Sequence, residues 1–98
     1  MVKLMTGQEA DEHLKKLSVE WALPNDATLH RVYPFDSYQK ALKFVAKVGK
    51  IAEKHNHHPK ITVVWGKVEV ECSTHEVGGL TSRDFKLAKA IEAVYRGP

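Results

Sequence analysis

The chain lacks the sequence features of disulfide-bonded, membrane-spanning and secreted proteins. Cys72 is the only cysteine, so no internal disulfide is possible, and a lone thiol is typical of a reducing compartment. No apolar run approaches the roughly 18–20 residues that cross a bilayer, and the N-terminal residues carry no signal-peptide pattern. These absences predict a cytoplasmic protein with no membrane partner.

An excess of one charge sign is also missing. The formal net charge is only +3, which is too weak to indicate a nucleic-acid partner. No internal repeat, low-complexity stretch or linker interrupts the chain, so 1–98 is predicted to be one domain. A domain of this size has a modest core, and self-association is a reasonable way to bury more surface.

The hydrophobic pattern predicts three helices and four strands. In chain order, the pattern predicts a helix at 7–17, strands at 19–23 and 27–35, a helix from a cap at Asp36 or Ser37 to 55, strands at 61–65 and 67–74, and a helix opening at 81–84. The first helix follows a capping box, Thr6 to Glu9. Two hairpins with intervening helices predict an α+β, two-layer fold: a four-stranded antiparallel sheet with helices packed on one face.

The long helix is clearly amphipathic. Its core face is predicted to be the stripe Tyr38, Ala41, Leu42, Val45, Gly49 and Ala52. A second apolar line, either extra core or a subunit contact, consists of Phe44, Val48 and Ile51. The opposite, wet face carries Lys40, Lys43, Lys47, Lys50 and Lys54. No aromatic residues interleave these lysines, so the lysine stripe is weak support for nucleic-acid binding.

The strands predict which side chains are buried. Val68, Val70 and Cys72 alternate with charged residues, so they are expected on the buried face of their strand. Cys72 is then an inert, small core residue. Trp65, at the end of the preceding strand, is also expected in the core.

Chemistry-bearing residues gather in the second half of the chain. Four of the six histidines lie within twenty-one residues, at 55–75, and histidine exchanges protons near neutral pH. His57 and His58 fall between a helix and a strand, where catalytic groups concentrate, although a polar helix end explains them too. Pro59 restricts the backbone after the pair. His55 is interpreted as a surface residue.

Three more polar residues each admit two interpretations. Glu53 lies four residues before His57, so it is either a partner that orients a histidine or binds substrate, or an ordinary surface pair. His75 by itself resembles a solvated loop residue, but it is also a plausible partner of the histidine pair, because hairpin ends lie near helix ends in a two-layer fold. Asp84 lies at the third position of the last helix, where capping is favoured over catalysis.

The spacing of these residues resembles the pterin-4a-carbinolamine dehydratase family. The family pattern is an acidic residue (Glu53), three spacers, His57-His58-Pro59, five spacers, an aromatic (Trp65), nine spacers, His75, eight spacers and Asp84. Every position is filled at the family spacing, and the similarity extends from about Thr6 to Val94. A match at this many points is far more specific than a lone short motif.

The resemblance implies the α+β fold and an activity. The activity is dehydration of a 4a-hydroxytetrahydropterin, the 4a-carbinolamine, to quinonoid dihydropterin and water, in tetrahydrobiopterin recycling or related pterin metabolism, without a cofactor. His58 and His75 would exchange protons with the leaving hydroxyl and a ring nitrogen, while His57 and Glu53 position the substrate. Those roles are open to permutation among the three histidines.

The resemblance also implies further site residues. Residues implied to contact the pterin are Glu53, Pro59, Trp21, Ser73, Thr74 and Glu76. Asp84 and Trp65 would have structural or supporting roles. Family members form dimers that assemble into tetramers, so a homodimer or homotetramer is expected.

Two other functions remain open at this point. A zinc site would draw on His55, His57, His58 and His75, although the adjacency of His57 and His58 makes shared coordination awkward and no spaced cysteine ligands exist. A non-catalytic binding module is the other alternative, since animal relatives act as dimerisation cofactors for a homeodomain transcription factor through a helical surface.

Overall fold

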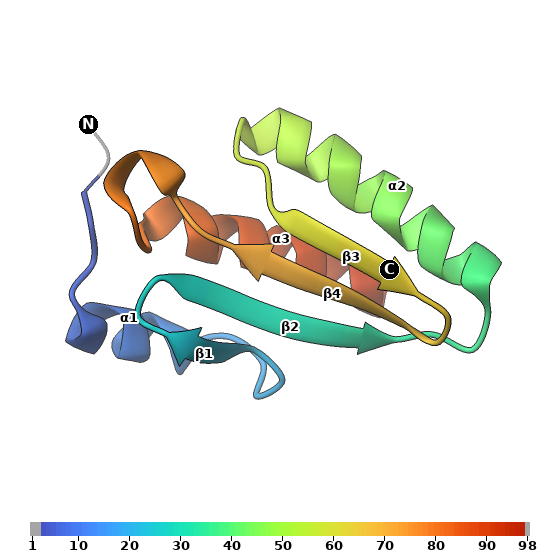
Figure 1. Cartoon of the computed structure of the whole chain (residues 1–98), viewed down its shortest axis with the longest axis horizontal. Coiled ribbons are helices and arrows are strands. Elements are labelled where there is room, and N and C mark those ends of the chain that lie inside the picture. The colour runs from blue at the N-terminus through green and yellow to red at the C-terminus, as the bar shows by residue number, and fades with distance from the viewer. Residues whose placement is uncertain (1–2, 98) are drawn as a thin grey trace.

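The computed structural model describes residues 3–97 as a four-stranded antiparallel sheet with three α-helices (Figure 1). The elements in chain order are α1 (Gly7–Leu14), β1 (Ala22–Asn25), β2 (Thr28–Pro34), α2 (Tyr38–His55), β3 (Lys60–Val64), β4 (Lys67–Cys72), the short 3₁₀ helix η1 (His75–Val77) and α3 (Ser82–Arg96). The strand order is β1-β2-β4-β3. The predicted fold class and element order are confirmed.

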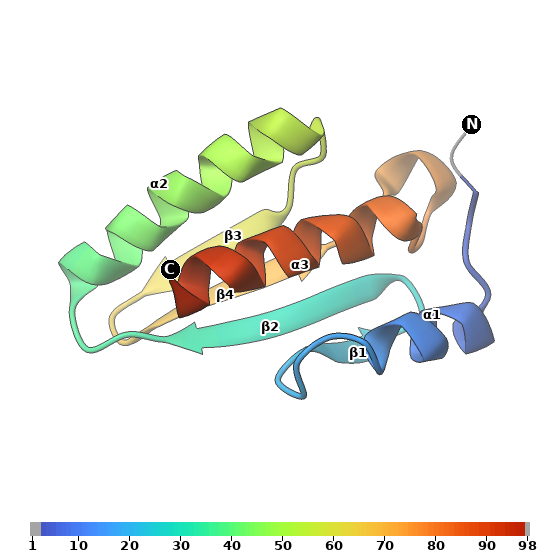
Figure 2. The ribbon, with the colours of Figure 1, turned by 180° about the vertical axis from the view of Figure 1, so that it is seen from behind.

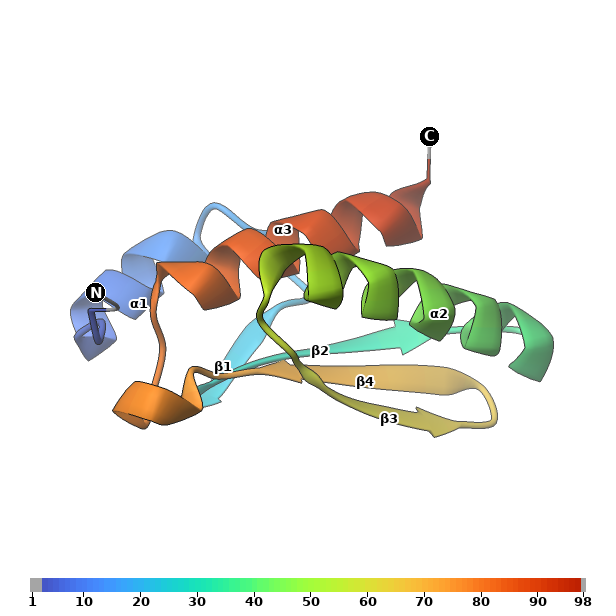
Figure 3. The ribbon, with the colours of Figure 1, turned by 90° about the horizontal axis from the view of Figure 1, so that it is seen from above.

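The three helices cover one face of the sheet and leave the other face open, as Figures 2 and 3 show from two sides. The core lies between the two layers and includes Leu29, Tyr33, Phe44, Val48, Val68, Val70, Leu87 and Ile91. Within the part of the chain that the structure describes, no helix is both long and apolar enough to cross a bilayer.

The helix α1 starts as predicted and ends earlier. The Glu9 amide donates to Thr6 Oγ1 at 3.1 Å, and the Thr6 amide donates to Glu9 Oε1 at 2.9 Å, which completes the capping box. The helix ends at Leu14 because the chain then tightens into turns, in which the Leu17 amide donates to the Leu14 carbonyl. Such three-residue bonds commonly close a helix end.

The first strand is shifted toward the C-terminus relative to the prediction, whereas β2 lies within its predicted bounds. The strand expected at 19–23 lies at β1 instead, and Val19 is 94% exposed. Asn25 forms the turn, since its Oδ1 accepts from the Ala27 amide at 2.8 Å. Pro24 lies inside β1, which is compatible with an edge strand because proline has no amide to donate.

The buried face of α2 combines the two predicted apolar lines. Ala41 and Ala52 of the first stripe are buried, whereas Tyr38 and Leu42 of the same stripe are 47% and 46% exposed. Phe44 and Val48 of the second line are also buried, so this line is extra core. The Phe44 ring packs against Tyr33, with centroids 4.8 Å apart. The lysines at the five predicted wet positions are all exposed.

The second hairpin confirms the predicted alternation of β4. Val68, Val70 and Cys72 are fully buried. The expectation that Trp65 lies in the core is wrong, because its side chain is 78% exposed. Trp65 follows the last residue of β3 and occupies the turn with Gly66, whose φ of 92° suits glycine. At this position the alternation of the strand no longer directs the indole inward.

Candidate active site

The end of α2 separates the two adjacent histidines. Asn56 has a left-handed backbone (φ 49°, ψ 42°), and its amide donates to the carbonyls of Ala52 and Glu53. The next amide, that of His57, donates to the Ala52 carbonyl at 3.1 Å. This reversal directs His57 inward, where it is buried, while the side chain of His58 is 59% exposed.

His57 is held by a buried carboxylate from the start of α3. Its Nε2 lies 2.6 Å from Asp84 Oδ1. The other oxygen, Oδ2, accepts from the Thr74 hydroxyl at 2.8 Å and from the Thr81 amide at 3.0 Å. A fully buried carboxylate requires such donors, because burial without partners would be very costly. The predicted capping role of Asp84 is confirmed, and the bond to His57 is an additional role.

The network around Asp84 fixes the orientation of the His57 ring. An ionised carboxylate only accepts hydrogen bonds, so Nε2 is the donor in its contact with Asp84. Thr74 and Thr81 are also bonded to each other, with their hydroxyl oxygens 2.8 Å apart. The loop between β4 and α3 is therefore tied to the end of α2 through Asp84.

The exposed histidines face a small cavity. Its volume is about 160 Å³, and it is lined by Thr28, His58, Lys60, Glu71, Ser73 and His75. His58 follows α2, and His75 begins η1, so two segments far apart in the sequence bring imidazoles to one cavity. Of the predicted site residues, the cavity brings together His58, His75 and Ser73.

Glu53 contacts His58 rather than His57. The carboxylate pairs with His58 Nε2. The spacing of four residues would place Glu53 beside His57 only if the helix continued, and the reversal at Asn56 ends it. Charge-assisted bonds of this kind are short and directional, so Glu53 orients the ring that lines the cavity.

Other predicted contacts lie elsewhere. The Thr74 hydroxyl is already bonded to Asp84, and the Thr74 amide donates to the Gly79 carbonyl at 2.8 Å. Trp21 is buried, and its Nε1 donates to Glu92 at 3.0 Å. The structure brings neither side chain to the cavity.

The remaining predicted site residues lie near its rim or beyond it. Pro59 is half-buried beside His58. Glu76 is exposed on η1, and its Oε2 lies 3.6 Å from an Arg83 nitrogen. His55 is exposed, as predicted.

Thr28, Lys60 and Glu71 line the cavity but were not among the predicted site residues. Glu71 and Ser73 have the same parity along β4 and the residues after it, so strand alternation alone places them on one face. The neighbourhood of Lys60 and Glu71 depends on the pairing of β3 with β4, in which the two residues are direct partners. That register is not visible in the sequence of either strand alone.

A second buried carboxylate lies away from the histidines. Glu92 on α3 accepts from Trp21, from Arg31 Nε at 2.8 Å and from the Tyr33 hydroxyl at 2.9 Å. Burial by itself would raise the pKa of Glu92, but the bonds from Arg31 and Tyr33 outweigh it and lower the pKa to about 2. Burial, followed by the bond to Glu92, raises the pKa of Tyr33. The cluster ties α3 to β2.

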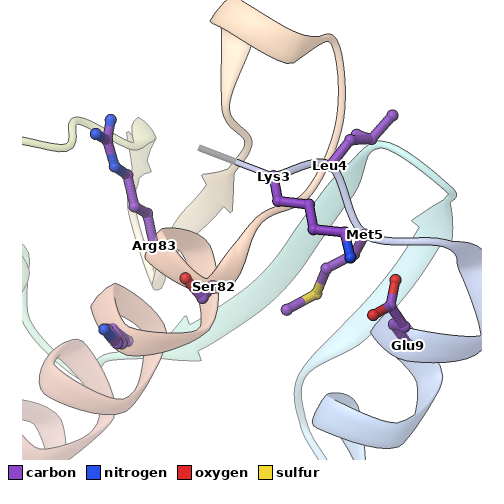
Figure 4. A pocket seen from close by; sticks show the side chains of 7 residues that line it. Lys3, Leu4, Met5, Glu9, Ser82 and Arg83 are labelled. Carbon is purple, nitrogen blue, oxygen red and sulfur yellow. The ribbon is translucent and has the colours of Figure 1, made fainter. Parts of the chain in front are cut away.

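Another cavity, of about 400 Å³, lies between the N-terminal segment and the start of α3 (Figure 4). It is lined by Lys3, Leu4, Met5, Glu9, Ser82, Arg83 and Lys86. Figure 4 shows the side chains of Lys3 and Arg83 pointing in different directions. The lining contains no histidine, so this cavity is a poor candidate for proton transfer.

The histidines are not arranged as a metal site. Among residues 3–97, no group of three or more histidine, cysteine or acidic side chains is placed to hold a metal ion. His57 is bonded to Asp84 inside the protein, while His58 faces the opposite, solvent side. His57 and His58, two of the ligands that the zinc hypothesis required, are therefore separated between the interior and the surface.

The fold and the site together define a small α+β protein with a buried histidine–aspartate pair and a histidine-lined cavity. Residues 3–94 match the model of the family described as pterin 4 alpha carbinolamine dehydratase. The chain belongs to this family.

Individual relatives agree with this assignment. A Rickettsia canadensis protein, provisionally named pterin-4-alpha-carbinolamine dehydratase, is 41% identical over 88% of this chain and 79% of its own length. The crystal structure of a transcriptional coactivator/pterin dehydratase from Brucella melitensis is 29% identical, covers 95% of this chain and 99% of its own, and has a TM-score of 0.88. A pterin dehydratase-like RuBisCO assembly factor from the alpha-carboxysome, 17% identical, shares the fold over 82% of this chain and 93% of its own, with a TM-score of 0.65.

Proposed function

We propose that this protein dehydrates a 4a-hydroxytetrahydropterin to the quinonoid dihydropterin and water by histidine acid–base catalysis. The observation that carries the proposal is the cavity that His58 and His75 line together with Ser73. Membership of the family supplies the reaction class. Recycling of tetrahydrobiopterin, or another step of pterin metabolism, is the setting in which this reaction is useful.

The chemistry needs two proton transfers. The bond between C4a and the hydroxyl oxygen breaks, and an acid protonates the departing oxygen so that it leaves as water. A base removes the proton from the ring nitrogen whose lone pair drives the expulsion. Two imidazoles can perform both transfers without a cofactor, because histidine is the side chain used most often for general acid–base catalysis, and each such contribution is worth about 10²–10⁴-fold.

The geometry favours a division of roles among the three histidines. His58 and His75 face the cavity and are the candidates for direct proton exchange with the substrate. Glu53 orients His58 through the contact between its carboxylate and His58 Nε2. His57 is buried against Asp84, so we propose that it supports the pocket wall rather than contacting the leaving hydroxyl.

Stopped-flow absorbance of carbinolamine dehydration tests the proposal. The wild-type protein should accelerate the reaction over buffer, and His58→Ala and His75→Ala should each slow it by about 10²–10⁴-fold. His55→Ala is the matched control, because His55 is exposed on the same helix end and does not line the cavity. A folded wild-type protein that gives no acceleration would refute the dehydratase proposal.

A second candidate function is a non-catalytic binding module. Its binding surface would be apolar, and the same surface could serve self-association. Tyr38, Leu42, Val64 and Trp65 are exposed apolar residues. The start of α2 and the end of β3 lie at the same end of the molecule in Figure 1. We propose that this apolar end contributes to a homodimer or homotetramer.

Light scattering after size exclusion tests this role. Leu42→Lys should shift the protein toward the monomer, whereas Lys43→Glu on the adjacent wet face should not. A monomeric wild-type protein would contradict self-association. Full dehydratase activity in monomeric Leu42→Lys would show that the apolar end is not needed for catalysis.

A further inference from the structure

We propose that Glu71 selects the substrate by accepting hydrogen bonds from the 2-amino group and the adjacent ring N–H of the pterin. The inference rests on the proposed function for the identity of the ring. It adds a specificity-determining residue that the family pattern of acidic, histidine and aromatic positions does not contain.

Glu71 lies near the end of an inner strand of the sheet. It is on β4, opposite His30 of β2 and Lys60 of β3 in the sheet register. Lys60 Nζ is 3.6 Å from Glu71 Oε2, and the two side chains are 75% and 35% exposed. Glu71 therefore has Lys60 beside it at the cavity, while its carboxylate stays partly open to a ligand.

The chemistry of the lining makes Glu71 distinct. Among the six lining residues, Glu71 carries the only carboxylate, and the others are hydroxyls, imidazoles and an ammonium group. The nearby Glu53 contacts His58 but is not part of the lining. A ligand edge with two parallel N–H donors thus finds one matching ionic acceptor, whose two oxygens can receive both bonds.

The size of the cavity fits recognition of one ring edge. Its volume of about 160 Å³ is below the roughly 300–1,000 Å³ of sites that enclose a drug-sized ligand. The amino-amide edge of a flat bicyclic ring fits such a space. Because His58 and His75 line the same cavity, a ring anchored at Glu71 keeps its hydroxyl-bearing carbon close to both imidazoles.

Binding of two ring analogues isolates this contact. Pterin carries the 2-amino group, and lumazine carries an oxygen acceptor at that position on the same ring system. Fluorescence titration of each compound against the wild-type protein should show a preference for pterin of roughly tenfold or more, the scale of one hydrogen bond to a charged group. Glu71→Gln should abolish or invert that preference, because the new amide can donate to the lumazine oxygen.

Glu69→Gln is the matched control. Glu69 lies two residues earlier on the same strand and face, and its Oε1 is 3.4 Å from His30 Nε2, outside the cavity lining. It should keep the wild-type preference although it loses the same charge. The assignment is overturned if wild-type protein binds neither compound or does not discriminate between them, or if Glu71→Gln retains the preference.

The binding experiment and the dehydration assay can refute the two proposals separately. A wild-type protein that prefers pterin through Glu71 but does not accelerate dehydration would refute the proposed reaction and retain the assignment of Glu71. Conversely, active protein whose pterin preference is unchanged in Glu71→Gln would retain the reaction and refute this inference.

Discussion

Asp84 is the residue on which the buried part of the site depends. Its two oxygens receive a ring nitrogen, a hydroxyl and an amide, from His57, Thr74 and Thr81. In Asp84→Asn one oxygen becomes an amide nitrogen, which faces donors that it cannot accept from. We expect a loss of roughly 1–3 kcal/mol in the free energy of unfolding, the usual cost of an unsatisfied buried group, together with slower dehydration.

Urea unfolding and stopped-flow kinetics measure the two effects of Asp84→Asn. Thr81→Ser is the control, since it preserves the hydroxyl that caps α3 and bonds to Thr74. If Asp84→Asn had wild-type stability and activity, the buried network would have neither a structural nor a positioning role.

Cys72 should be inert in the folded protein. Burial, followed by the charge of Asp84, raises the pKa of its thiol, and the thiolate is the reactive form. We expect a thiol reagent to label native protein only as fast as the protein opens, and to label urea-unfolded protein rapidly. Fast labelling under native conditions would contradict the burial of Cys72 and the electrostatics around it.

At the scale of elements, Asn56 determines how α2 presents the two histidines. Its left-handed backbone is easy for glycine and asparagine and costs other residues roughly 1–2 kcal/mol. Asn56→Ala should therefore destabilise the protein by about that amount and reduce activity, while Asn56→Gly should preserve both. Denaturant unfolding with parallel kinetics compares the two variants, and equal behaviour would show that this backbone reversal is unimportant.

The sequence predicts local features of the elements better than features that depend on distant partners. The caps at Thr6 and Thr81 and the alternation of β4 were predictable because short-range spacing encodes them. The burial of Ala41 and Ala52 on α2 was predictable in the same way. The role of the neighbouring line stayed open between extra core and a subunit contact, because Phe44 packs against residues that are distant in sequence, including Tyr33 and Tyr95.

In the candidate site, too, local features were predictable from the sequence and features that depend on distant residues were not. The motif spacing singled out His58 and His75, and both line one cavity. The separation of His57 from His58 depends on the turn at Asn56, and the place of Glu71 depends on strand register. The motif spacing predicts neither the separation of the two histidines nor the place of Glu71, so these parts of the site required the three-dimensional structure.

At the scale of the whole molecule, Glu92 joins the helical layer to the sheet and sets the response to acid. Its pKa of about 2 in the folded protein is below the ordinary value of 4.5. The stabilisation that Glu92 contributes is fully present above about pH 4.5 and is lost as the pH falls through 2. A difference of this size corresponds to about 3 kcal/mol, since each pKa unit is worth about 1.4 kcal/mol.

Glu92→Gln should therefore flatten the dependence of unfolding free energy on pH between about 4.5 and 2. Near neutral pH the same variant should be less stable than wild type, because Arg31 keeps its charge in the core without a charged partner at Oε1. Glu12→Gln, at an exposed position of α1, is the control and should leave the acid response unchanged. Urea unfolding at a series of acidic pH values measures all three proteins. Parallel curves for wild type and Glu92→Gln would mean that another group couples folding to protons, and that the Glu92 cluster contributes packing rather than charge stabilisation.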